Sequence, residues 1–400
     1  MTQLHEAFLV SGARTPVGKY GGALSSVRPD DLAALTIKAV IEDAGIDPAD
    51  VDEVILGNAN GAGEENRNVA RMAWLLAGYP DTVPGMTVNR LCASGMSAIS
   101  VATAMVRSGQ ADIIVAGGVE SMSRAPWVME KPKSAFAKPG ETFDTSIGWR
   151  FVNPVFAARE KMTLSMPETA EEVARQFNVT REQADEFAVA SQAKAAAAME
   201  AGRFDAEIVP VEIRDRKGNI TAVTRDEGPR PGTTTEALSK LRPVVDQVVT
   251  AGNSSTLNDG ASAVIVASAA AVEKYGLTPR ARVVASTQTG LHPSIMGMGP
   301  VEASRQALER VGWSMDSLDA VELNEAFASQ SVACMREMGV DPGIVNAWGG
   351  AIALGHPLGS SGARITVTLL NRMEQGDLKR GLATMCVGVG QGTALLVEKV

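Results

Sequence analysis

Short apolar runs alternate with helix-like stretches along the first 120 residues, and this alternation constrains the fold more than any other feature. Apolar runs predict strands at residues 7–10, 54–56, 87–89 and 113–116, and helical periodicity predicts helices at residues 29–44, 66–76 and 93–107. Strands that alternate with helices are typical of an α/β domain whose central sheet is covered on both faces. The sequence therefore predicts an α/β fold for this region.

A second α/β unit of similar element order is predicted from about residue 281 to the end. Its predicted strands are residues 283–285, 320–323, 382–386 and 394–398, and its predicted helices are residues 301–311, 325–338 and 359–375. Between the two units the pattern is broken by repeated Pro and Gly, apart from helices that begin near residue 167 and at residue 180. We expect an N-terminal half (1–120, completed by 257–277), an inserted loop domain with substrate contacts (121–256) and a C-terminal half (278–400).

The charge balance argues against nucleic acid and anionic membranes as partners. Lys and Arg number 37 and Asp and Glu number 46, which gives a formal charge of −9 without any basic block. The longest nearly apolar run, residues 261–272, is too short to span a bilayer. Three scattered cysteines do not form a disulfide framework, and no signal peptide is visible. We expect a cytoplasmic protein with neither a membrane nor a nucleic acid partner.

Cys92 stands at a predicted strand-to-helix junction in the segment TVNRLCASGMS (residues 87–97). A thiol at a helix N-terminus lies near unsatisfied N–H groups, which favour the thiolate and lower its pKa. The same N–H groups can stabilise an oxyanion. Cys92 is therefore a candidate nucleophile, and the alternative is a small buried hydrophobic residue, as most lone cysteines are.

His356 is one of three histidines and lies in the glycine-rich segment GGAIALGHPLG (residues 349–359). Glycine on both sides permits tight turns and a close approach of substrate. The residue is either a base that accepts the proton of a nearby thiol or a histidine that satisfies loop backbone groups. Asn324, in ELNEAFA (residues 322–328), is similarly either a helix N-cap or a functional polar group.

Cys386 begins the glycine loop CVGVGQG (residues 386–392). This loop does not fit a dinucleotide site, because it ends a strand and the chain stops before the acidic residue such sites require. The loop leaves backbone N–H groups free to face a ligand, although Cys386 taken alone is best explained as a buried cysteine before a turn. Cys92, His356 and Cys386 offer no closely spaced ligand pair, so no metal site is expected.

Taken together, these segments resemble the thiolase family along essentially the whole chain. NRLCASG (89–95), NEAF (324–327), GHP (355–357) and CVGVGQG (386–392) occur in the family's order, and GGVESMS (117–123) and TAGN (250–253) also match. The resemblance implies a thiolase fold, in which two similar α/β halves form a five-layer αβαβα core with an inserted loop domain. It also implies a homotetramer built as a dimer of dimers.

The resemblance implies a reversible reaction through an acyl-enzyme. Cys92 attacks the 3-keto carbon of a 3-oxoacyl-CoA, His356 activates the thiol, and Cys386 protonates the departing acetyl-CoA carbanion before CoA takes the acyl group. One implied oxyanion site consists of His356 and a water held by Asn324, and the other of the backbone N–H groups of Cys92 and Gly388. No metal or bound cofactor is implied, because CoA is itself a substrate. The implied CoA contacts are Ser255, Met166, Ala326, Phe327 and Arg230.

Within the family, the stretches 123–126, 144–150 and 166–170 look closest to 3-oxoadipyl-CoA thiolases of aromatic degradation. Ser165 stands where acetoacetyl-CoA thiolases typically have His, and Val245 where they often have Phe, so both positions are expected to alter the pocket. Trp348 replaces a small polar residue, usually Asn, and either narrows the site or packs outside it.

Three alternatives to a 3-oxoadipyl-CoA thiolase stay open at this point. The first is an acetoacetyl-CoA thiolase (acetyl-CoA acetyltransferase) that works in condensation. The second is a non-catalytic protein of the same fold that binds acyl-CoA or lipid. The third is a ketoacyl synthase, which Cys386 argues against because that class usually has His in its place.

Overall fold

The computed structural model describes residues 4–400, so the first three residues of the predicted N-terminal half lie outside it. Its centre is a long mixed sheet with two halves of related strand order. The first half contains, in spatial order, β1 (Ala7–Arg14), β10 (Asn258–Ser268), β5 (Ile113–Ser121), β3 (Glu53–Gly57) and β4 (Gly85–Val88). The second half contains β11 (Ala281–Gly290), β14 (Gln391–Lys399), β13 (Arg380–Val387) and β12 (Ala320–Leu323). A short antiparallel pairing of β1 with β11 joins the halves.

The strand order reveals the internal repeat that the sequence only suggested. In each half the first strand pairs antiparallel with the last, and the next two strands follow in the same order. A parallel bridge between Val321 and Val345 lies where β4 lies in the first half. The two halves are therefore built on one topology.

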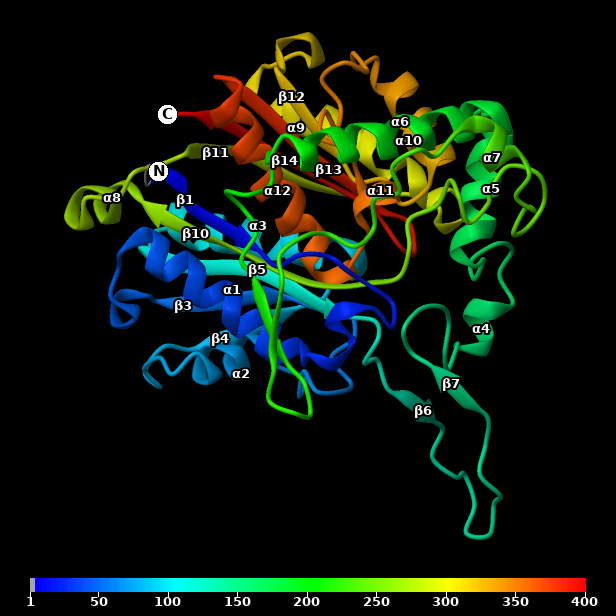
Figure 1. The fold of residues 1–400 in the computed structure, drawn as a ribbon, viewed down its shortest axis with the longest axis horizontal. Coiled ribbons are helices and arrows are strands. Elements are labelled where there is room, and N and C mark those ends of the chain that lie inside the picture. Colours follow the sequence, from blue (N-terminus) through cyan, green and yellow to red (C-terminus); the bar gives the residue numbers. More distant parts are fainter. Residues whose placement is uncertain (1–3) are drawn as a thin grey trace.

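Helices form three layers around the two halves of the sheet (Figure 1). The middle layer contains α3 (Ser94–Arg107) and α12 (Leu358–Gln375), which contact each other and both halves. One outer layer contains α1 (Pro29–Ala44) and α2 (Val69–Leu76), and the other contains α9 (Gly299–Val311) and α10 (Ala328–Met338). Burial follows this arrangement, because α12 is covered on every side from Gly359 to Met373. The predicted five-layer α/β core is confirmed.

Glycine at the crossing of α3 and α12 lets the two central helices touch through their backbones. A Cβ atom at Gly362 would lie 2.4 Å from the backbone nitrogen of Met96, and one at Gly95 would lie 2.7 Å from the carbonyl oxygen of Gly359. Both contacts occur near the first turn of each helix. The crossing therefore brings the two helix N-termini, and the chain segments that precede them, together.

Two helix starts differ from the sequence prediction for local reasons. Helix α2 begins at Val69 because Asn66 and Arg67 have positive φ angles of 50° and 66°, and the Asn68 side chain caps the helix by accepting from the N–H of Arg71. Helix α10 begins at Ala328 because the preceding segment stays extended up to Phe327, which pairs with Ser254. The second difference bears directly on the role of Asn324.

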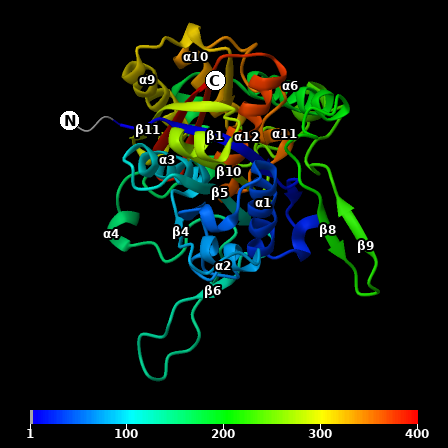
Figure 2. The ribbon, with the colours of Figure 1, turned by 90° about the vertical axis from the view of Figure 1, so that its left-hand side faces the viewer.

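The region inserted between β5 and β10 folds into helices and two projecting hairpins. One hairpin, β6 (Trp127–Met129) with β7 (Thr142–Asp144), extends well away from the core in Figure 1, and Figure 2 shows the other, β8 (Val211–Arg214) with β9 (Ile220–Val223). Its helices are α4 (Pro154–Ala157), α5 (Met166–Gln176), α6 (Arg181–Glu200) and α7 (Thr235–Ser239). The sequence analysis missed both hairpins because their strands are only three or four residues long.

The remaining short elements complete the connections. They are β2 (Gly18–Lys19), α8 (Ala269–Tyr275), α11 (Ala351–Leu354) and the 3-10 turns Ala23–Ser26, Pro48–Asp50, Leu91–Ala93, Pro293–Met298 and Met315–Ser317. The division at residues 120, 256 and 278 stays our proposal for the domain boundaries.

Candidate active site

Cys92 lies in the middle of a 3-10 turn, Leu91–Ala93, immediately before α3. The turn is sharp because Leu91 adopts a positive φ of 46°, and the Asn89 side chain holds it by accepting from the Leu91 N–H at 2.9 Å. The thiol is half-buried at the edge of the apolar cluster between the two halves of the sheet. The strand-to-helix junction predicted for this residue is confirmed.

Two backbone N–H groups point at the Cys92 sulfur, those of Cys92 itself and of Gly388. Burial nevertheless raises the pKa of the Cys92 thiol to about 11, since it outweighs these two donors, and the nearby Glu120 carboxylate raises the pKa further. The expectation of a lowered pKa is therefore wrong for the free protein. The resting nucleophile is a thiol whose surroundings already contain two aligned donors.

Gly388 reaches this position through a tight turn after β13. Val389 and Gly390 both have positive φ, 62° and 76°, which reverses the chain into β14. A Cβ atom at Gly388 would lie 3.0 Å from the Leu91 side chain. Glycine at 388 therefore allows the loop to lie against the Cys92 turn.

Cys386, at the end of β13, is buried in a small apolar cluster that also contains Met166, Ala326 and Phe327. Burial raises its pKa well above the ordinary value for a thiol, and the proximity of Cys92 adds to the rise. The structure thus brings the second predicted thiol next to the first. It also gathers three of the five residues for which CoA contacts are implied.

His356 is buried, and its hydrogen bonds determine which ring nitrogen carries the proton. The Ser361 hydroxyl donates to the carbonyl of Pro357 at 2.9 Å, so its oxygen accepts from the imidazole Nδ1–H at 2.6 Å. Nε2 is then left as the acceptor, and it faces the Asn324 side-chain amide at 3.4 Å. Burial, with a smaller effect from the Arg364 charge, lowers the pKa of His356 to about 3. The imidazole is therefore neutral at physiological pH, with its basic nitrogen toward Asn324.

Asn324 does not cap a helix, because α10 begins four residues later. Its backbone N–H donates to the carbonyl of Thr384, which attaches it to β13 two residues before Cys386. Within residues 4–400 its side-chain Oδ1 is buried and has no hydrogen-bond partner. A buried polar atom of this kind ordinarily binds a water or a ligand. Of the two alternatives for Asn324, a helix N-cap or a functional polar group, the structure therefore supports the second.

The cavity in front of Cys92, here called the Cys92 cavity, has a volume of about 370 Å³. Its walls include Cys92, Gly388, Met166, Ser165, Glu120 and Arg150. Burial raises the pKa of Glu120 to about 7, although its carboxylate accepts from the N–H groups of Ala59 at 2.9 Å and Gly359 at 2.8 Å. Glu120 lies in the GGVESMS segment and Arg150 in the stretch 144–150, but the sequence gives no sign that either side chain lines the cavity.

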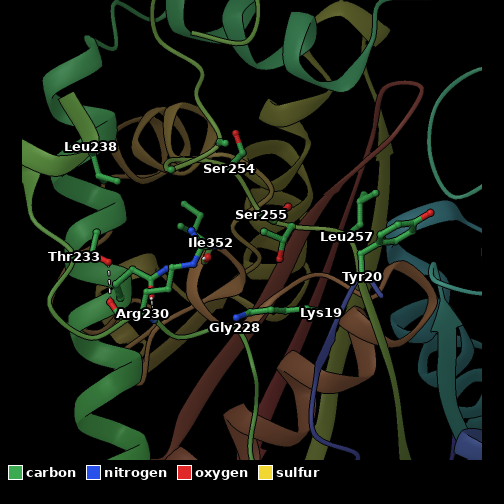
Figure 3. A pocket seen from close by; sticks show the side chains of 14 residues that line it. Lys19, Tyr20, Gly228, Arg230, Thr233, Leu238, Ser254, Ser255, Leu257 and Ile352 are labelled. Atoms are coloured by element: carbon green, nitrogen blue, oxygen red, sulfur yellow. Dashed lines mark hydrogen bonds between the residues drawn. The ribbon is translucent and has the colours of Figure 1, made fainter. Parts of the chain in front are cut away.

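A second cavity, the Ser255 cavity, has a volume of about 390 Å³ (Figure 3). It is lined by Ser255, Arg230 and Lys19, and these side chains surround the open space in Figure 3. The Ser255 N–H donates to the carbonyl of Ala326 at 3.0 Å, so one strand-like pairing separates this cavity from the Cys386 cluster. Two cationic side chains on its walls suit an anionic ligand.

Ser165, Val245 and Trp348, the three positions expected to affect the pocket, differ in where their side chains lie. Ser165 lines the Cys92 cavity, whereas Val245 is exposed and lines neither cavity. Trp348 packs edge-on against Phe204 at a centroid distance of 5.8 Å, beneath α6 and α11. Of the two alternatives for Trp348, the structure supports packing outside the site. Cys334 is a buried core residue.

Within residues 4–400, no group of three or more His, Cys, Asp or Glu side chains is arranged to hold a metal ion. None of the helices in this part of the chain combines the length and the apolar character that crossing a membrane requires.

Comparison with known proteins agrees with this site. Residues 7–270 match the family "Thiolase, N-terminal domain" and residues 277–399 match "Thiolase, C-terminal domain". The beta-ketoadipyl-CoA thiolase of Pseudomonas aeruginosa is 56% identical, covering 99% of both chains. The 3-oxoadipyl-CoA/3-oxo-5,6-dehydrosuberyl-CoA thiolase of Escherichia coli (strain K12) is 51% identical, covering 99% of this chain and 100% of that protein.

The fold agrees as well. The crystal structure of the Bacillus anthracis acetyl-CoA acetyltransferase superimposes with a TM-score of 0.94 at 39% identity, covering 100% of both chains. Because both family domains match over nearly the whole chain, the chain belongs to the thiolase family.

Proposed function

We propose that the protein catalyses the reversible CoA-dependent cleavage of 3-oxoadipyl-CoA to acetyl-CoA and succinyl-CoA through an acyl-Cys92 intermediate. The observation that carries this proposal is that the Cys92 thiol, on the wall of the Cys92 cavity, lies close to both the Gly388 N–H group and the Cys386 thiol. The names of the curated relatives support the choice of substrate.

The resting protonation states explain how the first step would proceed. A thiol with a pKa of about 11 and a neutral imidazole form no stable ion pair, so Cys92 loses its proton to His356 as it attacks the 3-keto carbon. The tetrahedral oxyanion is held by His356 and a water bound to the free Oδ1 of Asn324. Each such donor is worth roughly 3 kcal/mol in enzymes where it has been removed.

The second thiol handles the proton at the departing carbon. Breaking the C2–C3 bond leaves the acetyl-CoA carbanion, which takes the proton of Cys386. Free CoA then enters, gives its proton to Cys386, and attacks the acyl-Cys92 thioester. The N–H groups of Cys92 and Gly388, which lie beside the Cys92 sulfur, stabilise the oxygen of that thioester.

We assign the Ser255 cavity to CoA. Arg230 and Lys19 supply positive charge for its phosphates, and Ser255 lies between them and the Cys386 cluster. Met166, Ala326 and Phe327 offer an apolar surface for the pantetheine arm that leads to the two thiols. CoA acts as a substrate in this scheme, and no bound cofactor or metal is required.

We further propose a cytoplasmic homotetramer. The β6–β7 hairpin carries Trp127 and a fully exposed Phe136 far from the core, and apolar groups on such an arm favour contact with another chain. Three free cysteines suit a reducing compartment.

The test compares CoA-dependent loss of 3-oxoadipyl-CoA and acetoacetyl-CoA in the wild type, in Cys92→Ala and in the matched control Cys334→Ala. We expect preference for 3-oxoadipyl-CoA, a loss of roughly 10⁴-fold or more in Cys92→Ala, and nearly full activity in Cys334→Ala. Cleavage that survives in Cys92→Ala would contradict the proposal. Tight binding of acyl-CoA without turnover would support a non-catalytic protein. A preference for acetoacetyl-CoA would support a general acetyl-CoA acetyltransferase.

A further inference from the structure

Arg150 is a cation on the wall of the Cys92 cavity that the reaction scheme above does not use. It lies in the inserted region just after β7 and lines the same cavity as Cys92, Gly388 and Glu120. Glu120 and Arg150 are the ionisable side chains of the cavity besides Cys92, as far as residues 4–400 are concerned. The cation therefore faces the space that the acyl chain, and not the CoA phosphates, would occupy.

The guanidinium is held at the cavity by a neutral partner. Its Nη2 lies 3.4 Å from Oδ1 of Asn60, a long hydrogen bond. Asn60 is itself buried and fixed, because its amide nitrogen donates to the carbonyl and hydroxyl oxygens of Thr145 at 3.1 and 2.8 Å. The neighbouring Arg124, by contrast, pairs with Glu64, whereas Arg150 forms no ion pair within residues 4–400. Most of its donors are thus available to a ligand.

An acyl chain that ends in a methyl group gains nothing from a charged wall, since an unpaired cation loses hydration as the cavity fills. A chain that ends in a carboxylate accepts two parallel N–H···O bonds from a guanidinium. In 3-oxoadipyl-CoA the carboxyl carbon lies three bonds beyond the 3-keto carbon, a span of roughly 3.8 Å when extended. A substrate whose 3-keto carbon meets Cys92 therefore carries its carboxylate within the cavity that Arg150 also lines.

The Glu120 carboxylate lines the same cavity and would repel an anionic substrate on its own. The positive charge of Arg150 on the same wall offsets this repulsion for an acyl chain that carries a carboxylate.

From these contacts we infer that Arg150, held by Asn60, binds the distal carboxylate of a dicarboxylic 3-oxoacyl-CoA and sets the preference of the enzyme for such substrates over neutral ones. The inference rests on the proposed thiolase activity and adds to it a specificity-determining residue.

The test measures kcat/KM for 3-oxoadipyl-CoA and for 3-oxohexanoyl-CoA, which has the same chain length and a methyl group in place of the carboxylate. The variants are Arg150→Gln, Arg150→Lys and, as a matched control, Arg159→Gln, an exposed arginine of the same region that lines neither cavity. We expect Arg150→Gln to lose roughly 10- to 100-fold in kcat/KM for 3-oxoadipyl-CoA, mainly through KM, with little change for 3-oxohexanoyl-CoA. Arg150→Lys should recover part of the preference, and Arg159→Gln should behave as the wild type.

Binding of the unreactive adipyl-CoA and hexanoyl-CoA to Cys92→Ala, with and without Arg150→Gln, gives a readout that does not depend on turnover. The inference predicts that Arg150→Gln weakens adipyl-CoA binding alone. Equal losses for both ligands would instead assign Arg150 to CoA or to folding, and unchanged preference would overturn the inference while leaving the thiolase proposal intact. A wild type without cleavage activity would refute the proposed function. The binding measurements with adipyl-CoA and hexanoyl-CoA would still test whether Arg150 recognises the carboxylate.

Discussion

At the scale of single residues, Cys92 shows how two electrostatic effects compete at one sulfur. A helix N-terminus contributes roughly 0.3–1 kcal/mol to a nearby anion, which is less than one pKa unit. Removal of the thiolate from water shifts a pKa by several units in the opposite direction. Burial therefore wins and raises the pKa of Cys92 to about 11, so the site is arranged for an oxyanion and does not store a thiolate.

The alkylation rate of Cys92 by iodoacetamide is expected to increase continuously from about pH 6 to about pH 9.5, close to tenfold per pH unit. The reason is that only the thiolate reacts, and its fraction grows with pH until the raised pKa of Cys92 is reached. The rate is measured by mass spectrometry of the peptide that contains Cys92, with Cys92→Ser as the blank. A plateau near neutral pH would show a stable thiolate–imidazolium pair and contradict this prediction.

Glu120 predicts a pH-dependent stability difference. Its pKa is about 7 in the folded protein and about 4.3 in an unfolded chain, so between these values the folded state binds more protons and stability falls as pH rises. Glu120→Gln keeps an acceptor for the Ala59 and Gly359 N–H groups and removes this loss. The variant should therefore gain up to about 4 kcal/mol relative to the wild type between about pH 4.5 and about pH 8.

The measurement is the free energy of unfolding by urea for both proteins at several pH values across that range. The difference between the two proteins isolates Glu120 from other titrating groups. A difference that stays constant with pH would mean that Glu120 titrates near its ordinary value in the folded protein.

At the scale of elements, the crossing of α3 and α12 explains why residues from remote parts of the chain meet. Each helix follows a site segment, Cys92 before α3 and His356 before α12. The helices approach through glycine near their first turns, so their N-termini lie together between the two halves of the sheet. The site is thus a consequence of how the repeated halves pack on their central helices.

Gly362→Ala is expected to lower the free energy of unfolding by roughly 1–3 kcal/mol and to reduce activity as well. The added Cβ would lie 2.4 Å from the backbone nitrogen of Met96, which no side-chain rotation relieves, so the helices must separate. Gly140→Ala is the control, because its Cβ meets nothing within 4 Å. Thermal and urea unfolding measure the effect. Wild-type stability in Gly362→Ala would show that the crossing is looser than these contacts indicate.

At the scale of the whole molecule, the projecting β6–β7 hairpin bears on assembly. Phe136 in this hairpin is fully exposed to solvent in the single chain, and the proposed tetramer would bury it. Light scattering after gel filtration should give the mass of four chains for the wild type and a smaller assembly for Phe136→Asp. Ile220→Asp, on the exposed β8–β9 hairpin, is the control and should stay tetrameric. A tetramer in Phe136→Asp would exclude the hairpin as the contact.

By itself the sequence determined the α/β alternation, the order of the four site segments and the chemistry of their side chains. These follow from periodicity and from residue types that stand close together in the chain. The tertiary structure alone decided that Asn324 presents a buried, unpartnered oxygen and caps no helix, that Cys92 rests as a thiol, and that Trp348 packs outside the site. It alone placed Arg150 on the wall of the cavity that also contains Cys92. The physical reason is that burial, desolvation and unpaired charge depend on neighbours contributed by remote segments, and no local pattern records which segments those are.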